Sequence, residues 1–210
     1  TKKKKIKIED FFLKSVWSNK NLKNKDYNNL HSFFWLFSLD LKSSKKITQS
    51  VILNWIDNNI NYNHKSWKID ILSKRIISWI SSSKLTYEDS DEAYKTKFNL
   101  IIQKQINHLI KEVEKSKFVY DKMISCAAII LVGISLNEKE KYLNFGLSLL
   151  KKIINSSFDN QYFPKTRSIR QLIFYLKYFV LIREWLKESQ NEIPEYLDEI
   201  IFYLGKSYAI

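Results

Sequence analysis

The sequence predicts an all-α fold, an (α/α) toroid-type array of antiparallel helical hairpins with inner and outer helix layers. Its 210 residues include three glycines and two prolines, too few for the turns of a strand-rich protein. The expected helices are joined by short connections, so neighbouring helices form antiparallel hairpins. Strongly apolar helices at 120–136 and 168–188 alternate with amphipathic helices at 138–156 and 194–206. Two layers of helices require this alternation, whereas a plain bundle does not.

The composition indicates one globular domain with a basic surface. Hydrophobic residues make up 45% of the chain, enough for one sizeable core. The formal net charge of +13 favours an anionic partner: nucleic acid, an acidic polysaccharide or a membrane surface. Lys, Asn and Ile are abundant along the whole chain, so part of this charge reflects a general compositional bias.

No membrane span or disulfide is expected. The apolar run at 127–134 is too short to cross a bilayer. Cys126 is the only cysteine, and its apolar neighbours predict a buried, inert thiol. Because the chain begins at Thr1 and stops inside an expected helix, we expect it to be a segment of a longer protein.

Residues 1–26 are expected to form a basic lead-in with a short helix near 9–17, ahead of a helical domain at 27–210. Apolar residues at helical spacing predict the first helices of that domain. These helices are expected at 30–41, from Ser43 or Ser44 through Ile56, at 66–80 with Ser66 as N-cap, and at 92–115.

Acidic and hydroxyl side chains at 86–92 precede the helix at 92–115, where negative charge favourably opposes the helix dipole. We interpret them as a helix start and not as a metal site. Gln105 falls on the apolar face of that helix. A buried amide requires hydrogen-bond partners, which are found either in the core or in the lining of a pocket.

A dense polar connection lies between the helices at 138–156 and 168–188, with Ser168 as the expected N-cap. Its polar residues and its proline are Asp159, Asn160, Gln161, Tyr162, Pro164, Lys165 and Arg167. Such a loop, held between rigid helices, is typical of binding sites. An ordinary helix–helix connection is the alternative interpretation.

The sequence contains no metal-ligand pattern, phosphate-binding loop or nucleophile motif, and no cofactor is expected. The remaining candidates are aromatic and basic residues near helix ends: His31, Trp35, Trp67, Arg75 and Trp79. Flat aromatic faces stack on sugar rings, and Arg binds carboxylates bidentately. Each of the tryptophans taken singly is more often a core residue, but together with the basic loop these residues favour a binding site.

These residues resemble the heparinase II/III-like family in its N-terminal helical domain. The resemblance covers most of the chain from about Trp17 onward. It rests on LHSFFWLFSL at 30–39, W-x-x-x-x-L-x-x-R-x-x-S-W at 67–79, the helix of Gln105, and FDNQYF at 158–163 before a long apolar helix. It implies an (α/α) toroid followed, in the full protein, by an antiparallel β-sandwich domain. It also implies a location in the periplasm or cell envelope.

The family's reaction is β-elimination at a uronic acid of an acidic polysaccharide such as heparin, heparan or alginate. One group neutralises the carboxylate, a base removes the C5 proton, and an acid, often Tyr, protonates the leaving 4-oxygen. Asp159 matches the Asp of the family's Asp-Gly-x-His loop, while Asn160 and Tyr162 replace its Gly and His. With these replacements, carboxylate neutralisation is expected to fall to Gln161, or to Tyr162 in another role, and Tyr162 is the candidate catalytic residue.

We expect a set of residues to line or support a substrate groove: His31, Trp35, Trp67, Arg75, Gln105, Gln161, Lys165 and Arg167. The expected partners are an acidic polysaccharide and the β-sandwich domain, and the isolated chain is expected to bind without turnover. The alternative hypothesis is a non-catalytic helical module for an acidic partner such as nucleic acid or a protein. Nucleic acid is the less favoured partner, because no aromatic-basic strand pattern is present.

Overall fold

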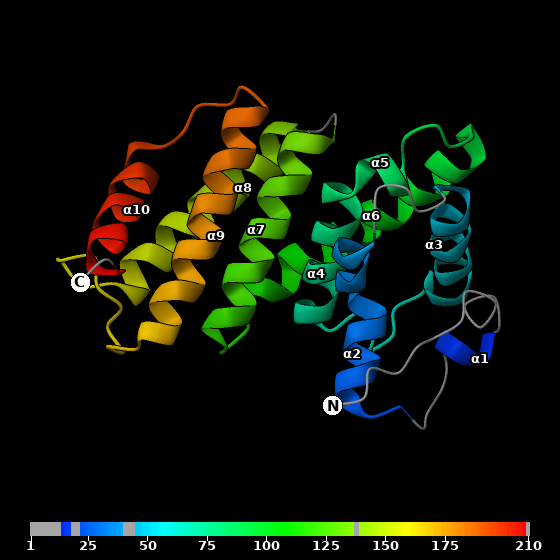
Figure 1. The fold of residues 1–210 in the computed structure, drawn as a ribbon, viewed down its shortest axis with the longest axis horizontal. Helices are drawn as coiled ribbons and strands as arrows, with labels where there is room; N and C mark the ends of the chain where they lie inside the picture. Colours follow the sequence, from blue (N-terminus) through cyan, green and yellow to red (C-terminus); the bar gives the residue numbers. More distant parts are fainter. Residues whose placement is uncertain (1–13, 18–21, 40–44, 137–138, 209–210) are drawn as a thin grey trace. The chain divides into compact units, whose positions relative to one another are not determined.

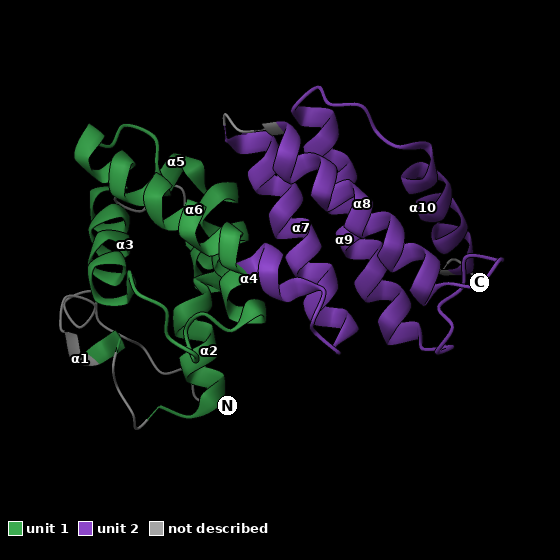
Figure 2. Cartoon of the chain, turned by 180° about the vertical axis from the view of Figure 1, so that it is seen from behind, with its two compact units in different colours: residues 1–108 green, residues 109–210 purple. Residues whose placement is uncertain are grey.

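The regular elements are all helical (Figure 1) in the part of the chain that the computed structural model describes, residues 14–17, 22–39, 45–136 and 139–208. Two compact units make up the chain, residues 1–108 and 109–210 (Figure 2). The first contains α1 (Lys14–Trp17), α2 (Asn24–Ser32), the 3-10 helix η2 (Phe34–Ser38), α3 (Lys45–Asn59), α4 (Ile69–Ser81), α5 (Ser83–Thr86) and most of α6 (Glu92–Val113). The second contains the end of α6, α7 (Val119–Ser135), α8 (Lys139–Ser157), α9 (Ile169–Glu188) and α10 (Glu195–Tyr208).

The predicted all-α class is thus confirmed for the described residues. None of the helices there is both long enough and apolar enough to cross a membrane. The short helix expected near 9–17 is described only from Lys14, and Ser43 and Ser44 lie outside the described residues.

The prediction of one helix at 30–41 is wrong. α2 begins at Asn24, within the stretch expected to be the basic lead-in, and ends before Phe33, which has a left-handed φ of 57°. This conformation costs about 1–2 kcal/mol for an L-residue. The buried ring of Phe33 packs against four tryptophans, which offsets that cost. Since η2 follows instead of a continuing helix, His31 and Trp35 do not share one helical face.

The prediction of Ser66 as an N-cap is also wrong, because α4 begins at Ile69 with Lys68 in the cap position. Ser66 lies in the preceding turn. There the side-chain oxygen of Asn63 accepts a hydrogen bond from the N–H of Lys65 at 2.9 Å. The side chain of Asn63 thus accepts a hydrogen bond from the backbone of this turn. The carbonyl of Ser66 faces the core, where Arg75 donates to it.

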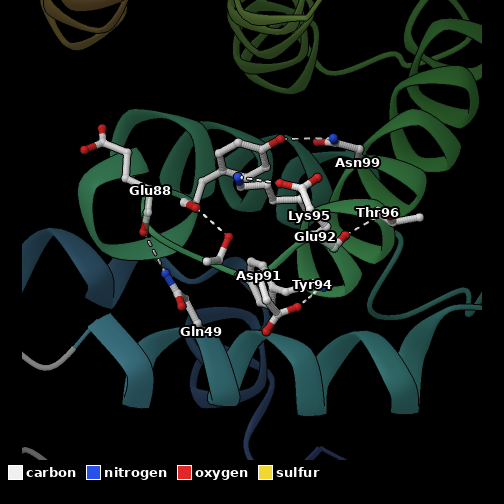
Figure 3. Close-up of polar contacts among 10 residues, drawn as sticks. Gln49, Glu88, Asp91, Glu92, Tyr94, Lys95, Thr96 and Asn99 are labelled. Carbon is white, nitrogen blue, oxygen red and sulfur yellow. Dashed lines mark hydrogen bonds and ion pairs between the residues drawn. The ribbon is translucent and has the colours of Figure 1, made fainter.

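The start of α6 confirms that the acidic stretch at 86–92 begins a helix (Figure 3). The carboxylate of Asp91 accepts a hydrogen bond from the N–H of Tyr94 at 2.8 Å, the usual arrangement of an N-cap. Glu92 in the first turn pairs with Lys95 at 2.9 Å. The preceding turn is tied to α3, because the side chain of Gln49 donates to the carbonyl of Glu88 at 3.1 Å.

α7 and α8 form a tightly packed hairpin. The middle of α7 is buried all round, as its apolar sequence predicted. A Cβ added at Gly133 would lie 2.5 Å from the backbone nitrogen of Leu143 in α8, so only glycine permits this approach. The buried thiol of Cys126 donates to the carbonyl of Gly146 at 3.3 Å, and burial raises its pKa. The prediction of an inert thiol is confirmed.

Ser168 is confirmed as the N-cap of α9, since its hydroxyl accepts a hydrogen bond from the N–H of Gln171. The expectation that α9 is buried all round is wrong: Ile173 and Val180 are exposed. The helix buries one face through Leu172, Tyr175, Tyr178, Phe179, Ile182 and Leu186. α10 packs along α9 and buries Leu197, Ile200 and Leu204, as its amphipathic pattern predicted.

Candidate functional site

Arg75 is the centre of a buried polar network in the first unit. Its Nη1 donates to the carbonyl of His31 at 2.8 Å and to that of Ser66 at 3.0 Å. Its Nε donates to Oε1 of Gln105 at 3.2 Å. The guanidinium carbon lies 4.2 Å from the centroid of the Trp55 ring, a cation–π contact. One side chain of α4 thus joins the end of α2, the turn before α4, and α6.

The ring of His31 is neutral and held in one tautomer. Trp55 donates its Nε1 hydrogen to Nδ1 of His31 at 3.0 Å, so Nδ1 carries no proton. Nε2 of His31 then donates to the carbonyl of Trp17 at 3.2 Å. Burial, together with the charge of Arg75, lowers the pKa of His31 to about 3. At neutral pH, His31 is therefore an uncharged link between hydrogen bonds.

Two polar atoms of this network have no hydrogen-bond partner. They are Nη2 of Arg75 and Nε2 of Gln105. Burial lowers the pKa of Arg75 to about 9, so its guanidinium is still charged at neutral pH. Because His31, Arg75 and Gln105 are fully covered by protein in this chain, they are placed to support a binding surface and not to line one. A role for them in substrate binding stays a prediction.

Trp35 and Trp67 use their indole N–H groups inside the fold. Nε1 of Trp35 donates to the carbonyl of Leu30 at 3.3 Å, and its ring remains half-buried. Nε1 of Trp67 donates to the carbonyl of Asn59 at 3.2 Å, and only 5% of Trp67 is exposed. Trp35 therefore keeps some surface for a ligand, whereas Trp67 underlies its neighbours.

In the second unit, Asp159 organises the loop between α8 and α9. Its Oδ1 accepts hydrogen bonds from the backbone N–H groups of Gln161 at 2.9 Å and Phe163 at 3.0 Å. Its Oδ2 pairs with Arg167 at 2.8 Å. These contacts lower the pKa of Asp159, with the bond from Phe163 contributing most. The carboxylate therefore fixes the shape of the loop.

Lys165 and Arg167 also make contacts within the loop region. Nζ of Lys165 donates to the carbonyls of Asn155 and Ser156, each at 3.1 Å, at the C-terminal end of α8. A cation at that position is favourable because the helix dipole is negative there. Arg167 lies over the ring of Phe163, 5.4 Å from its centroid, in addition to its ion pair. Both side chains remain exposed, and their contact with substrate stays a prediction.

The backbone of the loop enters the left-handed region at Tyr162, with a φ of 58°, and at Arg167, with a φ of 57°. Asn160, which stands at the family's glycine position, is not among the left-handed residues. Replacement of that glycine is therefore compatible with this loop conformation.

Tyr162 faces α10. Its ring stacks on that of Tyr203, with centroids 5.0 Å apart and planes inclined by 11°. Its hydroxyl hydrogen-bonds to the carboxylate of Glu199, which raises the pKa of Tyr162. The phenol is therefore protonated at neutral pH, and its O–H is engaged with Glu199. Gln161, next to it, is exposed.

Sequence reasoning missed Tyr203 and Glu199, because tertiary packing alone brings them to the loop. The signal that the sequence did contain was an adjacent aromatic pair, Phe202 and Tyr203, in an expected amphipathic helix. Both residues are exposed in the structure. Within the described part of the chain, no three His, Cys, Asp or Glu side chains are close enough to hold a metal ion.

Comparison with solved structures finds a match to the heparan sulfate lyase HepC from Pedobacter heparinus, with a TM-score of 0.75 and 13% sequence identity. The match covers 92% of this chain, which spans 33% of the length of that enzyme. No family model and no curated protein matches the sequence. The expected resemblance to the helical domain of a heparinase II/III-like enzyme is thereby confirmed as a likeness of fold.

Proposed function

We propose that this chain is the helical part of a polysaccharide lyase that acts by β-elimination on an anionic polysaccharide containing uronic acid. The observation that carries the proposal is the likeness of fold to a heparan sulfate lyase over 92% of the chain. The proposal includes an (α/α) toroid arrangement of the helices and, in the same protein, a partner β-sandwich domain. The formal net charge of +13 suits an anionic substrate.

In the proposed reaction, Tyr162 is the proton donor to the leaving oxygen. A base removes the C5 proton of the uronate, the electron pair forms the C4–C5 double bond, and the C4–O bond breaks. The departing oxygen takes the hydroxyl proton of Tyr162. The hydrogen bond to Glu199 raises the pKa of the phenol, so Tyr162 enters the reaction protonated, and its O–H must turn from Glu199 to the leaving oxygen.

In this proposal, the other polar residues of the loop bind the negatively charged groups of the substrate. The amide of Gln161 is exposed beside Tyr162 and donates to the uronate carboxylate, whose charge must be stabilised as the C5 proton leaves. Lys165 and Arg167 attract neighbouring acidic groups of the polymer. The buried set of His31, Arg75 and Gln105 keeps the helices of the first unit in register beneath the surface.

The proposal is tested with the protein that carries this chain, incubated separately with heparan sulfate, heparin and alginate. Elimination yields a conjugated 4,5-unsaturated uronate, so ultraviolet absorbance is expected to rise with one of these substrates. A flat trace for folded protein with all three would reject the lyase assignment.

The alternative of a binding module for nucleic acid has its own readout. Binding to duplex DNA of any sequence is then expected, with an affinity that falls steeply with salt as phosphate counterions are released. Turnover of a polysaccharide together with weak DNA binding would exclude this alternative.

A further inference from the structure

A second candidate surface lies in the first unit, around the exposed ring of Tyr62. This residue follows α3 and is 64% exposed. Its ring stands edge-on to the buried Trp67, with centroids 6.1 Å apart, and lies 5.2 Å from the ring of His108 on α6. Trp67 and His108 also contact each other, at 5.6 Å. Two neighbouring rings therefore support a large aromatic side chain that presents much of its surface to solvent.

Exposed lysines lie near Tyr62 in the sequence and on the strip of α6 that carries His108. Lys65 lies in the same connection between α3 and α4 as Tyr62 and is exposed. On α6, Lys97 pairs with Asp57 of α3 at 3.0 Å, and His108 contacts Tyr62 just beyond α3. Lys104 occurs between Lys97 and His108 at helical spacing, so it lies on the same strip of α6, beside the end of α3.

The acidic side chains nearby are already engaged. Asp57 pairs with Lys97, and Asp70 contacts both Lys68 at 3.9 Å and Lys74 at 4.0 Å. Lys65 and Lys104 appear in none of the ion pairs found among the described residues. The surface thus combines an exposed aromatic ring with an excess of positive charge.

We propose that Tyr62, Lys65, Lys104 and His108, here called the Tyr62 patch, bind one acidic sugar unit of the polysaccharide. The inference rests on the proposed function for its ligand class. The ring of Tyr62 stacks on the apolar face of a pyranose, and the two lysines contact a carboxylate or sulfate at the edge of that sugar. The imidazole of His108, tilted by 51° to the ring of Tyr62, supports that ring.

The test measures binding of heparan sulfate to the 210-residue chain by titration calorimetry. Tyr62→Ala is expected to raise the Kd about tenfold, because a lost stacking contact of this kind is worth about 1.4 kcal/mol. Tyr62→Phe keeps the ring and is expected to bind like the unmodified chain. Lys104→Gln is expected to weaken binding about threefold, whereas Lys84→Gln, at an exposed position of α5, controls for net charge and is expected to weaken it less.

Two results would overturn the inference. One is an unchanged Kd for Tyr62→Ala together with equal effects of Lys104→Gln and Lys84→Gln. The other is tighter binding of duplex DNA than of heparan sulfate, with the same dependence on Tyr62, which would make the patch a nucleic-acid surface. Because Tyr62 is exposed, its variants are expected to fold, and the Lys104→Gln pair gives a second readout.

The test separates this inference from the proposed function. Loss of heparan sulfate binding in Tyr62→Ala, with no ultraviolet signal from the parent protein, supports the patch and rejects the lyase. An ultraviolet signal combined with wild-type binding by Tyr62→Ala supports the lyase and rejects the patch.

Discussion

Nη1 of Arg75 donates to the carbonyl oxygen of His31 at 2.8 Å, and this bond joins α4 to the end of α2 across a sequence separation of 44 residues. The carbonyl belongs to the last turn of α2, where a cation is favoured by the helix dipole. The same nitrogen serves Ser66, so one group satisfies two buried carbonyls. The first unit is therefore expected to depend strongly on this single side chain.

Arg75→Lys is expected to lower the free energy of unfolding by about 3 kcal/mol, because an ammonium group cannot reach all three acceptors and leaves buried oxygens unpaired. Urea unfolding followed by circular dichroism measures the loss. Arg183→Lys is the matched control. Its ion pairs with Glu184 and Asp198 lie at the surface and are partly exposed, so a change below about 1 kcal/mol is expected there. Equal losses of stability from the two substitutions would contradict the conclusion that the first unit depends strongly on Arg75.

The stability of the chain is expected to fall as the pH drops from neutral, in part through His31. Its pKa is lowered from 6.5 to about 3 in the folded chain, so below pH 6.5 the unfolded chain binds a proton that the folded chain does not. The stability from this group is complete above pH 6.5 and declines toward pH 3, by up to about 1.4 kcal/mol per pH unit.

The variant His31→Gln isolates this effect from that of the carboxylates, because glutamine does not titrate. Between pH 7 and pH 5, the unmodified chain is expected to lose about 2 kcal/mol more than the variant does. The measurement is urea unfolding at both pH values. Parallel losses in the two proteins would mean that His31 is protonated in the folded state.

Two glycines give opposite expectations. Gly133→Ala places a Cβ 2.5 Å from the backbone nitrogen of Leu143 and forces α7 and α8 apart, at an expected cost of about 2–3 kcal/mol. Gly205→Ala meets no atom within 4 Å in α10, so the higher helix propensity of alanine is expected to add up to about 1 kcal/mol. Thermal unfolding should therefore shift Tm down in the first variant and up in the second. A rise in both would disprove close packing at Gly133.

Tyr162→Phe in the parent protein is expected to lower turnover at least tenfold, which corresponds to about 1.4 kcal/mol in the barrier. The substitution keeps the ring that stacks on Tyr203 and removes the proton donor. Tyr203→Phe is the control, because it preserves the stack and leaves the hydroxyl of Tyr162 untouched. Unchanged turnover in Tyr162→Phe would remove that residue from the mechanism.

Much of the helical framework was predictable because apolar spacing reports which face a helix buries. α7 and α10 follow their patterns, Ser168 caps α9, and the buried amide of Gln105 has a partner in Arg75. The break at Phe33 was not predictable, because aromatic residues at helical spacing also pack well around a left-handed residue and a 3-10 turn.

The character of the candidate site was less predictable than the helices. Periodicity places Arg75 on a face of α4, but it does not tell whether another element covers that face. The loop gave a similar difficulty: the sequence shows that Lys165 and Arg167 are basic, whereas their contacts with helix carbonyls and Asp159 depend on the path of the backbone. The partners of Tyr162 lie in α10, and the sequence of the loop itself does not indicate them.

The loop between α8 and α9 has one further consequence. Hydrogen bonds that shape it join residues of 155–171 to one another, and Tyr162 alone among its discussed side chains reaches α10. Apart from the contacts of Tyr162, the conformation of this segment is therefore set by its own residues. Grafted between the same two helices of a related scaffold, it is expected to keep its conformation if Glu199 and Tyr203 are carried with it. The side chains of such a segment can therefore be replaced together, and the chemistry of the loop altered, without a change in the packing of α8 and α9.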